Sequence, residues 1–107
     1  MNSARATLQS AATATGNGTA IDVANYDTVG IQVTGINGDT ITWEVSIDGT
    51  NWVGILAAPV TTGTGALTTT TNGIFVLGVT GLAFLRAKIS NYSAGSITVI
   101  ALLRKTQ

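Results

Sequence analysis

Apolar and polar side chains alternate along much of this chain with a period of two residues. The alternation is clearest over residues 40–48, where Ile41, Trp43, Val45 and Ile47 are separated by threonine, glutamate and serine. It recurs over residues 28–34, 84–90 and 96–104. A period of two is that of a β-strand with one buried face. We therefore predict strands at all four positions, with Trp43 in the core.

Glycine-rich turns divide the rest of the chain into similarly short segments. Thirteen glycines lie mostly between runs of threonine, valine and isoleucine, which favour strands. Four further strands are predicted at residues 8–15, 19–23, 52–57 and 74–79. No segment keeps a period of 3.6 residues, so helix should be negligible. About eight short strands separated by turns indicate an all-β fold, an antiparallel β-sandwich of jelly-roll-like or Ig-like type.

The connections between strands can be predicted in part. Asn37-Gly38 is the strongest hairpin signal, because both residues accept a positive φ, and it should join strands 28–34 and 40–48. A second turn is expected at residues 48–51, and residues 58–73 should form a long loop with room for one extended edge segment. Residues 1–7 lack the apolar stretch of a secretory signal. We expect them to form a flexible or partner-docking N-terminal arm ahead of a single domain at 8–105.

Two of the predicted strands are apolar on both faces. In 96–104, Ile100 and Leu102 oppose the other apolar residues, and in 74–79 both alternating sets are apolar. Outer faces of a two-layer sandwich are normally polar, so either another subunit or the loop 58–73 should cover these strands. The candidate self-association residues are Phe75, Leu77, Val79, Ile100 and Leu102. Replacing Leu102 with glutamate should then break self-association and lower the solution mass.

Composition narrows the classes of function. Only 9% of the residues are charged, five of each sign, and there is no histidine or cysteine. This removes the commonest general base, the commonest metal ligand and any disulfide. The net charge of zero argues against a nucleic-acid partner. No apolar stretch is long enough to span a membrane. We assign no catalytic, cofactor-binding or metal-binding residue and expect the protein not to be an enzyme.

Exposed aromatic side chains would indicate a sugar site. Trp43 is in phase with core residues, whereas Trp52, Tyr26 and Tyr92 lie at predicted turns or corners where they could be partly exposed. A glycan-binding module therefore stays open as an alternative.

Four segments of the chain resemble a known class of proteins. These are residues 18–35, 42–52 (TWEVSIDGTNW), 84–90 (FLRAKIS) and 95–99 (GSITV). Together they resemble small β-sandwich virion proteins of tailed bacteriophages, most closely the capsid decoration or cement proteins. The resemblance covers most of residues 18–100, and it carries no residue-level binding motif.

The resemblance implies a non-enzymatic structural role on the outer capsid surface. Such a protein bridges neighbouring major capsid subunits and is often a homotrimer. The expected partners are thus the major capsid protein and further copies of this chain. The candidate capsid-contact residues are Ser3 and Arg5 in the arm, with Arg86, Lys88, Arg104 and Lys105. The alternative that the resemblance leaves open is a tail or baseplate module that binds a cell-surface glycan.

Overall fold

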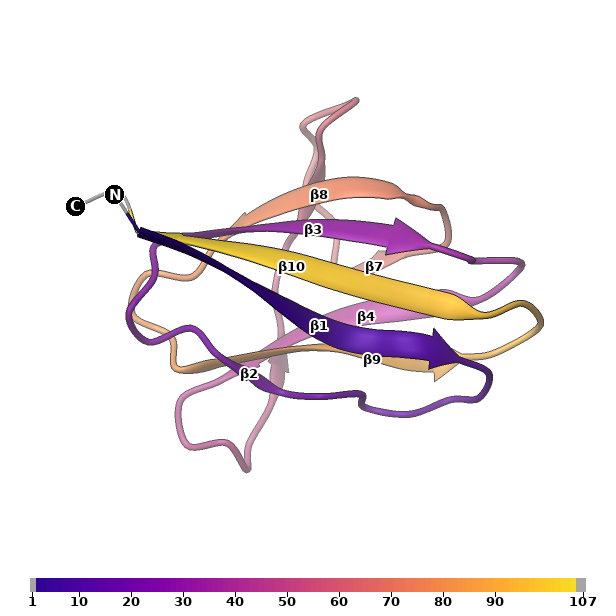
Figure 1. Cartoon of the computed structure of the whole chain (residues 1–107), viewed down its shortest axis with the longest axis horizontal. Helices are drawn as coiled ribbons and strands as arrows, with labels where there is room; N and C mark the ends of the chain where they lie inside the picture. The colour runs from indigo at the N-terminus through magenta and orange to yellow at the C-terminus, as the bar shows by residue number, and fades with distance from the viewer. Residues whose placement is uncertain (1, 106–107) are drawn as a thin grey trace.

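Two antiparallel sheets face each other in the computed structural model, which describes residues 2–105 (Figure 1). Sheet A has the order β1 (Asn2–Ala12), β10 (Ile97–Lys105), β3 (Thr28–Thr34), β8 (Gly73–Gly78) and β6 (Ala58–Pro59). Sheet B has the order β2 (Ile21–Asp22), β9 (Phe84–Asn91), β4 (Thr40–Ser46) and β5 (Val53–Gly54), and β7 (Thr68–Thr69) also pairs with β4. The predicted all-β antiparallel sandwich is confirmed. It has ten strands rather than about eight, because the segment 58–73 contributes β6 and β7.

The core lies between the sheets and is built from the inward side chains of each alternating strand. Trp43 of β4 is fully buried, as predicted, and its ring centroid lies 5.3 Å from that of Phe75 on β8. Gln9 ties the two sheets together at one side, since its amide on β1 donates a 2.7 Å hydrogen bond to the Ala87 carbonyl of β9. A single buried layer therefore fixes which side chains of each strand are left on the two outer faces.

The alternation predicted for residues 40–48 ends early. Strand β4 stops at Ser46, which is buried, while Ile47 is 69% exposed. The Ser46 hydroxyl donates to the Asp48 carboxylate at 3.0 Å and accepts from the Gly49 amide at 2.8 Å. This turn reverses the chain toward β5, so the prediction that Ile47 shares the core face was wrong.

The hairpin predicted at Asn37-Gly38 does not form. The strands on either side of it, β3 and β4, belong to different sheets, so the segment is a crossover between layers. Gly38 does adopt the positive φ expected, at 80°. Asn37, the other residue of the signal, does not adopt a positive φ. The signal therefore predicted the conformation of Gly38 correctly, and the conformation of Asn37 and the strand pairing wrongly.

The expected N-terminal arm is part of sheet A over its described residues. Residues 2–7 pair with β10, with Asn2 opposite Lys105 and Arg5 opposite Leu102. The first residue of the expected arm lies outside the described residues. Because β10 offers a full-length edge, the chain pairs along it from the start of β1 rather than standing free. Residues 2 and 105 consequently lie side by side at one end of the sandwich (Figure 1).

Asp39 locks two crossovers together at the other end. Its buried carboxylate accepts backbone hydrogen bonds from Asn37 at 2.9 Å, from Ala94 at 3.1 Å and from Ser93. Burial alone would raise the pKa of the Asp39 carboxyl, but these three hydrogen bonds outweigh it, and the pKa lies below its ordinary value. The ionised form therefore contributes to the stability of the folded state.

This lowered pKa predicts how stability depends on pH. The contribution of Asp39 should be complete above the unfolded pKa of about 3.9 and lost as the pH falls through the lower folded value. Asp39→Asn should therefore destabilise the protein at pH 7, because one of the two accepting oxygens is replaced by an NH2 group, a donor that faces a backbone donor. Urea unfolding at pH 7 and pH 3 tests this, since the gap between wild type and variant should narrow at pH 3. An equal gap at both pH values would contradict it.

Candidate functional site

The outer face of sheet B is polar and internally paired. Arg86 on β9 donates to Glu44 on β4 at 2.8 Å, and its guanidinium carbon lies 4.1 Å from the ring centroid of Trp52. Thr42 and Lys88 lie opposite each other on the same two strands and are only half-buried. This is the solvated face that an antiparallel sandwich normally presents.

The outer face of sheet A has a different character. Ile74 and Val76 on β8 are 49% and 44% exposed, and Leu102 on β10 is 42% exposed. Val60, just beyond β6, is 58% exposed, while Ile100 is half-buried. These residues, hereafter the sheet A apolar face, lie near one another because only β3 separates β10 from β8, and β6 pairs with β8. Exposed apolar surface of this kind, bordered by polar residues, is typical of a protein contact.

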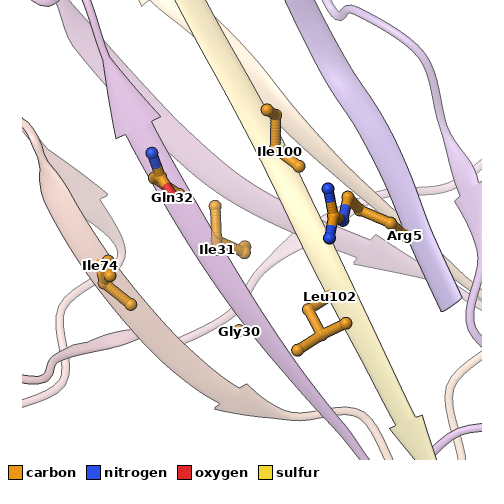
Figure 2. Close-up of a pocket in the computed structure, with 7 residues that line it drawn as sticks. All are labelled: Arg5, Gly30, Ile31, Gln32, Ile74, Ile100 and Leu102. Atoms are coloured by element: carbon orange, nitrogen blue, oxygen red, sulfur yellow. The ribbon is translucent and has the colours of Figure 1, made fainter. Parts of the chain in front are cut away.

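Gly30 leaves a hollow in the centre of this face. On β3 it lies opposite Leu102 on one side and Val76 on the other, in regular register. The hollow has a volume of about 370 Å³. The residues that line it, all labelled in Figure 2, are Arg5, Gly30, Ile31, Gln32, Ile74, Ile100 and Leu102. Figure 2 shows the Arg5 side chain reaching from β1 over β10, between Ile100 and Leu102.

Three of the five predicted self-association residues are not on a surface. Phe75, Leu77 and Val79 are at most 3% exposed and belong to the core. Phe75 lies opposite Ile31 and Leu77 opposite Val29, so they share the inward face of sheet A. With both faces of the strand apolar, the sequence pattern could not show which set points inward.

The other two predicted residues, Ile100 and Leu102, do lie on the sheet A apolar face. The exposed set on β8 is Ile74 and Val76, which the sequence analysis left unassigned. The alternative cover, the segment 58–73, reaches only the far edge of this face, where β6 pairs with β8.

The predicted capsid-contact residues fall into two groups on opposite sides of the molecule. Ser3, Arg5 and Arg104 are exposed at the end of sheet A where the chain begins and ends, with Ser3 opposite Arg104. Lys105 is at the same end and is half-buried. Arg86 and Lys88 lie on the outer face of sheet B instead, because β9 belongs to the other layer. The structure therefore brings the first group, and not the second, next to Ile100 and Leu102.

A second exposed apolar patch was missed by sequence reasoning. Ile47, Val53, Leu56 and Leu67 are between 48% and 69% exposed along the edge formed by β5 and β7. A shallow hollow of about 310 Å³ lies beside Ile47, Val53 and Leu82. Val53, Leu56 and Leu67 lie in or beside strands of two residues, too short to show a period, and Ile47 was assigned to the core because the alternation in residues 40–48 includes it. Only their apolar character next to turn residues could have marked them.

In residues 2–105, a metal ion would need a group of side chains that could bind it, and a sugar would need a surface of aromatic residues that could bind it. This part of the chain contains no group of three or more acidic, histidine or cysteine side chains that could hold a metal ion. It also contains no helix long and apolar enough to cross a membrane. Trp52 is half-buried beneath Arg86, and the half-buried Tyr92 donates its hydroxyl to the Gly95 carbonyl at 2.6 Å. Tyr26 is also half-buried and packs against the core. None of these three rings is therefore fully exposed to a sugar.

The same fold occurs in two solved structures. The SPBc2 prophage-derived protein YomS matches with a TM-score of 0.89 and 16% identity, over 95% of this chain and 92% of YomS. The PBSX exported protein XepA matches with a TM-score of 0.90 and 13% identity, over 95% of this chain. This chain spans only 37% of XepA. At such low identities the likeness establishes the shared fold.

Family membership rests on a separate comparison. No curated protein sequence matches the chain. The model of the XepA family, however, matches residues 2–101, which is nearly the whole of the sandwich. The chain belongs to the XepA family.

Proposed function

We propose that this protein is a non-enzymatic structural protein of a phage virion. In this proposal it decorates the capsid exterior and stabilises it by bridging neighbouring major capsid subunits. Membership of the XepA family and the fold shared with a prophage-derived protein support a phage origin. The resemblance of four segments to capsid decoration proteins supports the finer assignment.

The observation that carries the proposal is the difference between the two outer faces. Sheet B presents an ion pair and polar side chains, whereas sheet A presents the exposed Ile74, Val76 and Leu102 and a hollow lined in part by Ile74 and Leu102. Burying apolar surface is worth roughly 25 cal/mol per Å², and a specific contact typically covers about 800 Å² on each partner. A contact repeated over a shell adds avidity to each weak interaction. The sheet A apolar face is therefore the surface proposed to meet another protein.

The basic end of sheet A extends this surface. Arg5 borders the hollow, and Ser3 and Arg104 lie beside it. Arg86 lies on the outer face of sheet B, where it pairs with Glu44, so it is a weaker candidate for a contact made by sheet A. We propose the major capsid protein as the partner. We also propose that three copies of this chain associate as a homotrimer on the capsid surface.

Quantitative mass spectrometry of purified particles tests the proposal. We expect a copy number approaching one per major capsid subunit. A number lower by tens-fold would place the protein in the tail or baseplate instead. Complete absence from particles would refute the virion role.

A second candidate function follows from one relative. XepA is described as an exported protein, so a family member could act outside the virion. The same mass spectrometry, applied to the culture medium after particles are removed, distinguishes the two. Free protein in the medium together with absence from particles would favour the exported role.

A further inference from the structure

Gly30 has no backbone reason to be glycine. It is not among the residues with a positive φ, and the strand pairing is regular on both sides of it. A Cβ atom placed there would meet no atom within 4 Å. A glycine inside a strand weakens it, and when neither a bulge nor a tight bend explains it, the remaining use is close approach by another molecule. The missing side chain is what creates the hollow.

The hollow offers apolar walls with few polar groups. Leu102 and Ile100 form one side and Ile74 the other, and Gln32 places an amide at one end (Figure 2). This is the usual composition of a site for a large apolar group, whose orientation is set by a small number of polar contacts.

Arg5 adds a positive charge at the edge of the hollow. Glu44 pairs with Arg86 rather than with Arg5. Asp39 and Asp48 are occupied by nearby backbone amides at their own turns. Charge complementarity therefore calls for a carboxylate on whatever fills the hollow.

We propose that the hollow at Gly30 is a socket for an extended, acidic segment of a partner protein. One large apolar side chain of that segment fills the space above Gly30, and a carboxylate two residues along pairs with Arg5. This inference rests on the proposed function in one respect, because both place the partner on the outer face of sheet A. It adds the chemistry of the partner.

The spacing follows from strand geometry. Gly30 and Arg5 lie in one row across three strands, separated by Leu102, so their Cα atoms are about 9–10 Å apart. Residues i and i+2 of an extended segment point to the same side and lie about 6.6 Å apart. The Arg5 side chain reaches back over β10 and shortens the remaining gap. A Leu-Thr-Glu sequence meets both requirements.

The test is an NMR titration of the ¹⁵N-labelled protein with the peptide acetyl-Gly-Ser-Leu-Thr-Glu-Ser-Gly-amide. We expect amide shifts concentrated at Gly30, Gln32 and Ile74. Changing the peptide leucine to alanine, or its glutamate to glutamine, should weaken binding about tenfold. No binding by the wild-type protein at 10 mM peptide, or shifts centred on the β5 and β7 edge, would overturn the proposal.

Protein variants separate the socket from general effects on folding. Gly30→Val fills the hollow while favouring the strand, so it should lower affinity at least about tenfold without lowering thermal stability. Gly78→Val is the matched control on the same face, since a Cβ there also meets no atom within 4 Å and Gly78 does not line the hollow. It should bind within twofold of wild type.

Arg5→Gln should abolish the preference for glutamate over glutamine in the peptide, whereas Arg5→Lys should keep it. Unchanged binding by Gly30→Val would overturn the socket.

Particle occupancy separates this inference from the proposed function. If the peptide binds at the hollow but the protein is absent from particles, the virion role fails and the socket stands. If the protein is abundant on particles and the peptide does not bind, the socket fails and the virion role stands.

Discussion

Replacing Trp43 with alanine is expected to lower the free energy of unfolding by about 3–5 kcal/mol, the usual cost of deleting a fully buried aromatic side chain. Trp43 is 0% exposed and contacts Phe75 across the two sheets, so its loss opens a cavity in the core between them. A domain of this size is stable by roughly 5–15 kcal/mol, so the variant should keep only part of that margin. Urea unfolding followed by circular dichroism measures the loss.

A matched variant separates size from chemistry at the same position. The indole nitrogen of Trp43 is buried and has no hydrogen-bond partner among residues 2–105. Trp43→Phe removes this unpaired donor together with part of the ring, so the two effects offset each other. We expect a loss below about 1.5 kcal/mol, well short of that for alanine. Equal losses for the two variants would mean that the ring volume does not hold the sheets together.

The sequence predicted the strands better than it predicted their partners. Alternation in residues 28–34, 84–90 and 96–104 located β3, β9 and β10, because each strand buries one face. The pairing of β3 with β10 and β8, rather than with β4, joins segments far apart in the chain. Local turn chemistry at Asn37-Gly38 carries no information about such long-range pairing. The two additional strands, β6 and β7, have two residues each and show no period at all.

The sequence located only part of the candidate site, again because strand pairing cannot be predicted from local patterns. Two doubly apolar strands correctly indicated that one outer face is not fully polar, and Ile100 and Leu102 lie on it. For the other strand, the choice between Phe75 and Ile74 depends on register with β3, which the sequence does not show. The hollow at Gly30 was invisible for the same reason, since its walls, Leu102 on β10 and Ile74 on β8, come from strands that the sheet order places on either side of β3. Identifying a surface of this kind requires the sheet order.

Replacing Leu102 with glutamate should reduce the number of copies on particles by a hundredfold or more. In the proposed contact the new carboxylate is buried against an apolar partner surface, which costs about 3–5 kcal/mol when it is not paired there. The variant should still fold, because Leu102 is 42% exposed in the isolated chain. In the isolated chain the introduced glutamate would also lie opposite Arg5 on β1, where an ion pair can form, and docking would then have to remove that pair from water.

Lys88→Glu is the matched control for this prediction. It also changes charge in the middle of a strand, but on the outer face of sheet B, and it should alter occupancy less than threefold. Quantitative mass spectrometry of particles carrying each variant gives the occupancy, and the solution mass of each purified variant reports self-association. If Leu102→Glu lowers only the mass, the sheet A apolar face joins copies of this chain rather than the capsid. If it changes neither quantity while Lys88→Glu lowers occupancy, the docking face is sheet B, and the argument from apolar exposure is wrong.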